Sequence, residues 1–480
     1  MSVPTSGGWA NATRPRFDLP TRSQVEAGND ALPTTVAALR AHSRAALGLN
    51  AGSTIGTGHQ SAFFHGGILA KFMAASELAS SLGGAAQWVH FMSDADLVDP
   101  FSLELPCRTE GAPGFSRERV GLAPRARDAE ERTPSCARPA RRVLAAVDAS
   151  ALDARLPSRH ASAALTRALD CLAWADDSTD AATQGARAIE RAMSPWVSAP
   201  AARLGTGRLM ASPLGEFVLD AILRSPAECA ASFNRSLMRA PGAAKPLVVD
   251  EDHSEVPLWG IDEAGRRVRL RADEARSLRT TGRAILPRAS LASGLMRLHT
   301  DLFLHGVGGA RYELAGDSWW LEFLGIPLPP FGVVSADLRI APETAGLTPP
   351  APTHLSPSWR EASWNPRLLV PGDGTARVSE PRRTLLEVIT RERRRSPARR
   401  AAYEALLAQV SREREEMAEK LSALERAEVE NRVVLRAWRL AQDRTWPFLL
   451  LEPSLLDGLS AQMRARAQAW AATPCSGSGR

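Results

Sequence analysis

Lysine and tyrosine are the residue types that this sequence has least of. Of its 59 basic residues only Lys71, Lys245 and Lys420 are lysine, and its two tyrosines are Tyr312 and Tyr403. A GC-rich coding sequence, which favours arginine and alanine codons, accounts for this bias. Each lysine or tyrosine that is retained against the bias is therefore a candidate for a specific role.

Cysteine is also scarce, and its spacing excludes two classes of protein. The five cysteines include no CxxC pair and lie far apart, at Cys107, Cys136, Cys171, Cys229 and Cys475. Disulfide-rich secreted domains and cysteine-based zinc sites have closely spaced sets instead. We therefore expect a protein of a reducing compartment, by default the cytoplasm.

Long hydrophobic runs are missing as well. No stretch approaches the 18 or so uninterrupted apolar residues of a membrane-spanning helix, and residues 1–17 lack the apolar centre of a secretory signal. The net charge of +6 over 480 residues is too small to indicate nucleic-acid binding. With 44% hydrophobic residues the chain predicts a globular protein that has neither membrane nor nucleic acid as a partner.

Composition and element type divide the chain into an arm, a core with two insertions, a linker, a helical arm and a C-terminal part. These are an irregular arm at 1–33, an α/β core at 34–340, a polar loop at 107–141 and a helical insertion at 142–240 within that core, a proline-rich linker at 341–381, a coiled-coil arm at 382–447, and a helix with a tail at 448–480.

The core begins with a strand–helix–strand unit. Residues 53–57 and 87–92 are strand-like, and residues 66–82 between them have apolar side chains at helical spacing. This order is typical of a βαβ unit, which implies a parallel sheet. We expect an α/β fold with a parallel sheet.

Further strand-like segments follow in the second half of the core. Residues 247–256 and 258–270 are predicted strands, with a turn at 262–265. Shorter strands are predicted before and after two helices, and these segments are 283–287, 290–298 (helix), 301–304, 311–324 (helix) and 331–340.

The C-terminal third predicts one long helix. Nothing breaks helical spacing between Pro397 and Trp446, which at about 1.5 Å per residue gives a rod of roughly 70 Å. Spacing by sevens connects Val410, Met417 and Leu424, as in an imperfect coiled coil. We expect a coiled coil, within one chain or between two chains of a homodimer; the alternative is a long helix packed on its own domain.

The first candidate site lies between the first core strand and its helix, in Gly56–Lys71. The carboxyl end of a parallel strand is where open α/β sheets bind ligands, and the N-terminus of the next helix attracts anions. The segment is neither a Walker A loop nor a GxGxxG turn. Its candidates are Thr57, Gly58, His65, Gly66 and Gly67 for binding a nucleotide or another anion, and His59, Gln60 and Lys71 for catalysis.

The next strand ends in an acidic group. Asp94 and Asp96 should face His59, because the ends of neighbouring parallel strands lie side by side. Carboxylates there suit Mg²⁺ or a substrate ammonium group, which makes Asp94 and Asp96 candidates for catalysis and for metal binding. The alternative is that Asp94 only caps a turn.

A second glycine-rich turn occupies residues 301–312, again between an apolar run and a helix. Such a turn suits an anionic or sugar-like ligand, and we expect it to face the same cleft as the first segment. Its candidates for binding an acceptor are His305, Gly306, Gly308, Gly309, Arg311 and Tyr312.

These segments resemble the cysteine-adding enzymes of bacillithiol biosynthesis, the cysteine ligases. That family has a Thr-Gly-Gln-Gln loop, a glycine, a helix with lysine, an acidic Glu-Asp-His-Asp cluster, and later a Gly-Gly-Pro-Gly-Glu turn. The matching segments here are Thr57–Gln60, Gly66–Gly67, Lys71, Ser93–Asp96, Leu304–Tyr312 and Ser335–Leu338. His59 stands where the family has glutamine, Ser93 and Ala95 where it has glutamate and histidine, and Arg311 near a glutamate.

The resemblance implies a Rossmann-like parallel sheet core of the nucleotide-binding kind, and it also implies a function. Family members join the carboxyl group of cysteine to an amino sugar, and such an amide bond needs a carboxyl activated by ATP with Mg²⁺. The small-molecule substrates of this chain stay open. Two alternatives remain: a nucleotidyl- or adenylyl-transferring enzyme that uses His59 and His65, and a non-catalytic coiled-coil scaffold with a degenerate core.

Overall fold

The computed structural model describes most of the chain. The described residues are 15–108, 115–124, 133–144, 146–250, 253–341, 344, 357–370 and 378–474. The chain divides into two compact units. We call them the helical unit (1–9, 108–116 and 346–441) and the sheet unit (10–107, 117–345 and 442–480).

A six-stranded sheet forms the centre of the sheet unit. Its order is β1-β11-β10-β2-β3-β6, and all neighbours are parallel except the edge strand β1. The strands are β1 (Arg16–Asp18), β2 (Thr54–His59), β3 (Gln87–Met92), β6 (Ala202–Gly205), β10 (Leu302–His305) and β11 (Phe331–Ser335). The α/β class and the predicted parallel βαβ unit are confirmed.

The central strands alternate between two buried faces. On β3, Trp88 and His90 contact the ring of Phe72 at centroid distances of 6.2 and 5.1 Å. Phe91, the residue after His90, points to the other face, where its ring lies 5.9 Å from that of Phe303. A strand that is buried on both faces is what a parallel sheet between two helical layers requires.

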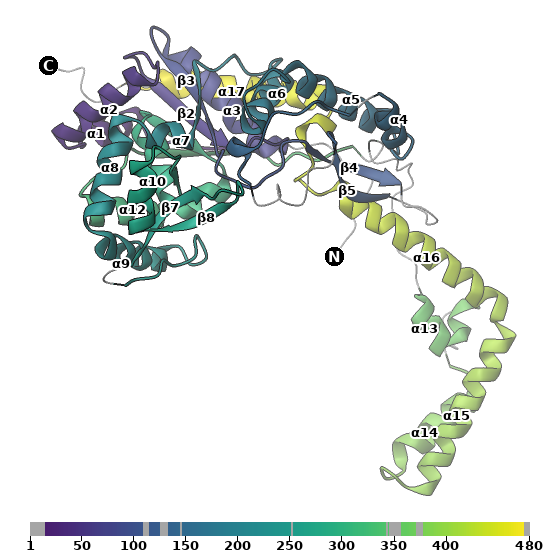
Figure 1. Cartoon of the computed structure of the whole chain (residues 1–480). Helices are drawn as coiled ribbons and strands as arrows, with labels where there is room; N and C mark the ends of the chain where they lie inside the picture. The colour runs from purple at the N-terminus through teal and green to yellow at the C-terminus, as the bar shows by residue number, and fades with distance from the viewer. Residues whose placement is uncertain are drawn as a thin grey trace. The chain divides into compact units, whose positions relative to one another are not determined.

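Helices cover both faces of this sheet. On the Phe72 face, α3 (Gly66–Leu82) lies beside α17 (Pro453–Ala471), although the two are far apart in sequence (Figure 1). The Phe91 face shares one hydrophobic core with several other helices. These are α2 (Thr34–Ala46), α7 (Thr206–Met210), α8 (Pro213–Arg224), α9 (Pro226–Ser236), α10 (Ala272–Thr280), α11 (Ser290–Leu298) and α12 (Val307–Leu324).

The other described strands form two small sheets. β7 (Glu255–Ile261) pairs with β8 (Arg267–Arg271) and β9 (Leu286–Pro287), both antiparallel. The predicted turn between the first two is present, with Gly265 at a φ of 78°. β4 (Ser102–Arg108) pairs with β5 (Phe115–Gly121).

Several predicted boundaries were wrong. The described part of the arm at 1–33 is not irregular, because it forms β1 and α1 (Arg22–Asp30), whose N-cap Thr21 makes a capping box with Gln24. The polar loop at 107–141 contains β5 and a short 3₁₀ turn at Ser135–Ala137, while 109–114 and 125–132 lie outside the described residues.

The insertion at 142–240 is not purely helical. Besides α4 (Ala146–Asp153), α5 (Arg159–Trp174) and α6 (Ala181–Met193) it contains β6, the edge strand of the main sheet. The four residues of β6, Ala-Arg-Leu-Gly, lack the β-branched and aromatic side chains that favour a strand. In the linker at 341–381 the structure describes α13 (Trp359–Trp364) and a 3₁₀ turn (Pro366–Leu369), and most of the rest lies outside the described residues.

The long helix of the helical unit is interrupted. It consists of α15 (Pro397–Glu416) and α16 (Ala418–Ala441), because Met417 leaves the helical conformation with a φ of −109° and a ψ of 15°. α14 (Glu380–Arg391) packs antiparallel to α15, since Ser379 and Arg382 at its start both donate to Glu413 near the end of α15.

The segment after α16 returns to the sheet unit. A 3₁₀ turn (Phe448–Leu450) precedes α17, which buries a single stripe of Leu456, Leu459, Met463 and Ala467. Among the described helices, none has the length and apolar content that crossing a bilayer demands.

We expect Leu459→Ala to lower the free energy of unfolding by about 2–5 kcal/mol, because the fully buried side chain would leave a cavity in α17. Urea unfolding followed by circular dichroism measures the change. Leu321→Ala, at a side chain that is 57% exposed, is the matched control and should change stability by less than about 0.5 kcal/mol. Equal effects of the two substitutions would contradict the packing described for α17.

Candidate active site

A cavity lies at the carboxyl edge of the six-stranded sheet. From β2 the chain passes through α3 to β3 on one side, and from β10 it passes through α12 to β11 on the other. Crevices at such reversals of strand order are the usual ligand sites of α/β sheets. The cavity has a volume of about 540 Å³, in the range of small-molecule sites. The ends of β2 and β10 and the first turns of α3 and α12 all line it.

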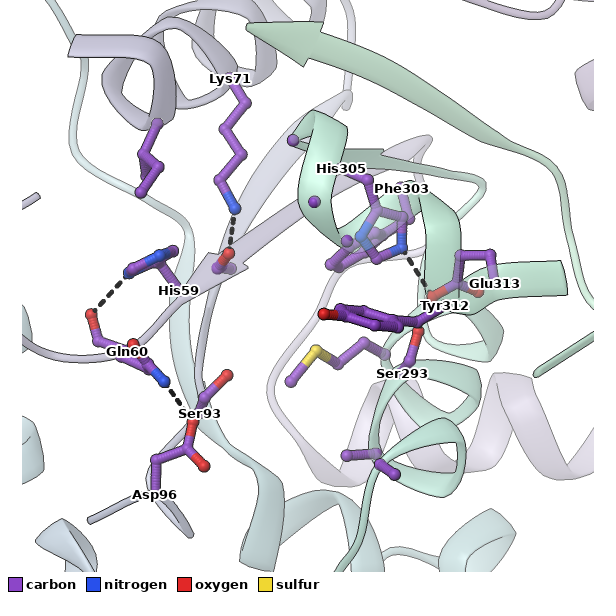
Figure 2. A pocket seen from close by; sticks show the side chains of 18 of the residues that line it. His59, Gln60, Lys71, Ser93, Asp96, Ser293, Phe303, His305, Tyr312 and Glu313 are labelled. Atoms are coloured by element: carbon purple, nitrogen blue, oxygen red, sulfur yellow. Dashed lines mark hydrogen bonds and ion pairs between the residues drawn. The ribbon is translucent and has the colours of Figure 1, made fainter. Parts of the chain in front are cut away.

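Lys71, one of the predicted site residues, is unusually buried for a lysine, with only 5% of the residue exposed. It projects from the second turn of α3 toward β2, where Nζ donates a hydrogen bond to the carbonyl oxygen of Gly58 (Figure 2). Within the described residues no carboxylate lies within ion-pair distance of it. Burial lowers the pKa of Lys71 to about 7. An anion in the cavity would supply the missing counter-charge.

The N-terminus of α3 adds to the positive side of the cavity. His65 caps it, with Nδ1 accepting from the amide of Gly67 at 3.1 Å. Arg444 approaches the same turn, and a Cβ on Gly67 would lie 2.9 Å from its Nη2. The guanidinium is held by Ser335 at 3.1 Å and by an ion pair with Asp337. Glycine at position 67 therefore permits an arginine to sit at a helix N-terminus, an anion-binding arrangement.

The two histidines of the first segment are both uncharged at neutral pH. Burial, followed by the proximity of Lys71, lowers the pKa of His59 to about 3, and burial together with Arg444 lowers that of His65 to about 4. Nδ1 of His59 donates to the carbonyl oxygen of Gln60 at 3.2 Å, so Nε2 carries its lone pair. The lone pair of His65 Nδ1 is used by the helix cap. The two histidines therefore differ in which ring nitrogen has a free lone pair.

Gln60 and Asp96 lie on the same wall of the cavity as His59 and Lys71 (Figure 2). The Gln60 side chain donates to Asp96 at 2.9 Å, and Arg267 of β8 lies 3.6 Å from the same carboxylate. Asp96 lines the cavity and its side chain is 40% exposed. A ligand can therefore reach both an amide and a carboxylate here.

Asp94 does not share this wall, although the sequence predicted that it would. Its carboxylate is buried and accepts hydrogen bonds from the backbone amide and the hydroxyl of Thr206, at the start of α7. Burial raises the pKa of Asp94. The described residues contain no group of three potential metal-binding side chains. The predicted Asp94–Asp96 pair is thus absent from the cavity, and Mg²⁺ binding stays a prediction that involves Asp96 alone.

The opposite wall comes from β10, α11 and α12 (Figure 2). His305 Nε2 lies 3.0 Å from the Glu313 carboxylate, which also accepts from Ser293 and, at 2.5 Å, from Arg297. Burial opposes ionisation of Glu313, but His305, Arg297 and Ser293 outweigh it and hold its pKa below the usual range. A buried carboxylate that is ionised and paired with an imidazole is typical of catalytic sites.

A strained residue lies at the base of this wall. Ala289, between β9 and α11, has a φ of 48° and a ψ of −122°. Residues other than glycine rarely adopt this backbone conformation. It lines the cavity just before Ser290 and Ser293. Strain of this kind costs about 1–3 kcal/mol and concentrates at functional sites.

The structure brings most of the predicted residues together. Those that line the cavity are Gly58, His59, Gln60, His65, Gly67, Lys71, Asp96, His305, Gly306, Gly308, Gly309 and Tyr312. Four predicted residues do not. Thr57 is buried and donates to Leu304, Gly66 packs beneath Leu338 and Leu451, Asp94 caps α7, and Arg311 is exposed on the outer side of α12.

Several residues of the cavity were missed. Glu313 follows Tyr312 directly, but it is one of three carboxylates in its helix, with Asp317 and Glu322, so nothing in the sequence distinguished it. Arg444, Thr206 and Trp259 come from segments remote in sequence, and only tertiary packing places them at the cavity. No spacing in the sequence could have found them.

Comparison of the chain with models of protein families and with curated proteins finds no match.

We expect Asp94→Ala to destabilise the protein by about 1–3 kcal/mol, because the buried amide of Thr206 loses its acceptor. Nucleotide binding should change less than threefold, since the side chain does not reach the cavity. Urea unfolding and calorimetric titration measure the two effects, with the exposed Asp30→Ala as control. Loss of nucleotide binding without loss of stability would restore Asp94 to the site.

Proposed function

We propose that this protein is an ATP-dependent ligase that activates a carboxyl group and transfers it to an amine, as in the cysteine ligases that its motifs resemble. The observation that carries the proposal is the buried, unpaired Lys71 beside the N-terminus of α3 and Arg444. These two cations suit the phosphates of a nucleotide, and a nucleotide is what activates carboxyl groups for amide formation.

The sheet supports this proposal. Its parallel strands, numbered in order along the chain, have the arrangement 3-2-1-4-5: β6, β3, β2, β10 and β11. That order is the one found in doubly wound, Rossmann-like nucleotide-binding folds, whose ligand lies beside the first strand. The cavity lies beside β2, the first of these strands.

The two walls suit two half-reactions. In the first, a carboxylate oxygen attacks a phosphorus atom of ATP, forming an acyl adenylate and pyrophosphate, or an acyl phosphate and ADP. Lys71 and Arg444 stabilise the negative charge on the phosphate oxygens. In the second, an amine attacks the acyl carbon, and AMP or phosphate leaves with the bonding electrons. The wall with His305 and Tyr312 faces the space where this amine would enter.

Isotope exchange tests this assignment. Wild-type protein is incubated with MgATP and each of the twenty amino acids, and exchange of labelled pyrophosphate or of labelled ADP into ATP is followed. Exchange that depends on one amino acid, cysteine in the resembled family, supports a ligase and identifies the intermediate. No exchange with any of them contradicts the proposal and leaves the nucleotidyl-transferring enzyme and the scaffold as alternatives.

We expect Lys71→Ala to weaken binding of ATP or ADP by about 1.5–3 kcal/mol, the value of a hydrogen bond to a charged group. This corresponds to a dissociation constant roughly 10- to 150-fold higher. Lys71→Arg should recover only part of the affinity, because a planar guanidinium does not replace a compact ammonium group. Calorimetric titration measures the three proteins. Lys420→Ala, exposed on α16, is the control, and wild-type affinity in Lys71→Ala would refute the anion site.

Nucleotide binding should also take up a proton at Lys71. The pKa of the free side chain is about 7, and an anion raises it because it favours the ammonium form. Above pH 7 the affinity should therefore fall with rising pH, by up to about tenfold per pH unit. Titrations at pH 8 in buffers of different ionisation enthalpy measure the uptake, which should vanish in Lys71→Ala.

The helical unit supports the proposal of a coiled-coil dimer. Val410 of the predicted seam is buried, whereas Tyr403 and Leu407 on the same helix are 50% and 41% exposed. A second copy of the chain would cover these two side chains. We expect Tyr403→Glu with Leu407→Glu to convert a wild-type dimer into a monomer, measured by sedimentation equilibrium. A wild-type monomer, or a dimer that the double substitution leaves intact, contradicts the dimer.

A further inference from the structure

His305 and Glu313 form a pair that the anion site does not use. Nε2 of His305 is buried and lies 3.0 Å from the Glu313 carboxylate, within ion-pair distance, but the two atoms do not form a hydrogen bond of regular geometry. An ionised carboxylate only accepts, so it favours the tautomer in which Nε2 carries the proton and Nδ1 the lone pair. Catalytic hydrogen bonds are often poorly aligned before substrate binds.

Other contacts hold this pair in place. Arg297 donates to Glu313 and is itself bound to the carbonyl oxygen of Pro329 at 2.9 Å through Nε, so the carboxylate has a fixed position. The His305 ring packs against Phe303 and Phe331, at centroid distances of 4.6 and 5.3 Å. The imidazole is therefore oriented from three sides.

Gly309 keeps one approach to the imidazole open. A Cβ at this position would lie 2.7 Å from Nδ1 of His305, whereas glycine leaves that space free. Both residues line the cavity, and the exposed 12% of the His305 side chain belongs to atoms other than the buried Nε2. The lone pair of Nδ1 is thus accessible past Gly309.

We propose that His305 is the general base of the transfer step and that Glu313 positions it. The proposal rests on the ligase function proposed above and extends it to the amine side. As the amine nitrogen bonds to the activated acyl carbon, Nδ1 of His305 takes one proton from that nitrogen. The leaving AMP or phosphate departs with the electrons of the broken carbon–oxygen bond. The products are the amide, AMP or phosphate, and an imidazolium that Glu313 stabilises.

Two substitutions remove the base in different ways. His305→Gln removes the proton acceptor. Gly309→Ala keeps it but places a methyl group 2.7 Å from Nδ1, so the ring or the helix must shift slightly, and urea unfolding checks that the variant is as stable as wild type before its activity is compared. The matched controls are His42→Gln, at an exposed histidine of α2, and Gly458→Ala, on α17 where a Cβ meets no atom within 4 Å.

The assay separates activation from transfer. Each protein receives MgATP, the amino acid that supports exchange, and glucosamine, ethanolamine or glycine as the amine; exchange and amide formation are both measured. We expect His305→Gln and Gly309→Ala to slow amide formation by about 100-fold or more, the usual contribution of a general base, and to change exchange less than threefold. Glu313→Gln should slow amide formation by a smaller factor.

The results that overturn the inference are distinct from failure of the ligase function. Amide formation within threefold of wild type in either variant excludes His305 as the base. So does a loss of exchange that parallels the loss of amide formation, or wild-type protein that exchanges but uses none of the three amines. If wild type shows no exchange at all, the ligase proposal itself is wrong.

Discussion

The divergence of β2 and β10 is the constraint on which the rest of the site depends. The two strands are neighbours and parallel, but the chain continues from them toward opposite edges of the sheet. Their following helices, α3 and α12, therefore begin on either side of a gap that no crossover fills. Polar backbone groups at two helix N-termini and at two strand ends face this gap, which would be costly in a closed core. A cavity that accepts a polar ligand is the consequence.

The sequence predicted those parts of the fold in which local pattern and tertiary position agree. The helices at 66–82 and 290–298 have the predicted bounds, and the strand at 87–92 does as well. Strand β6 could not be predicted, because its position in the sheet depends on pairing with β3 rather than on its own four residues. The break in the helix at Met417 was not predicted either, since methionine is a good helix former and nothing in the local sequence stops a helix there.

For the site, the two glycine-rich turns were predictable because each combines a strand end, a helix start and residues without bulky side chains. The direction of individual side chains was not. Asp94 and Asp96 are two residues apart, yet one caps α7 and the other lines the cavity, because only Asp94 meets Thr206. Arg311 and Glu313 show the same limit on a helix, where a shift of two residues turns a side chain to the opposite face. The position of Arg444 in the cavity depends on the path of the chain after α16, and no local sequence pattern predicts that path.

The distribution of charge gives the two walls different chemistry. On one wall Lys71 and Arg444 lie near a helix N-terminus, and both histidines are neutral. On the other wall a buried carboxylate faces an imidazole, and the charge of Arg297 allows that carboxylate to stay ionised in a low-dielectric setting. In the proposed acyl transfer, the positive wall would stabilise the anion that leaves, and the imidazole of the other wall would take the proton of the amine that enters. Both needs arise in the same acyl transfer, and a cavity with only one of these walls would meet only one of them.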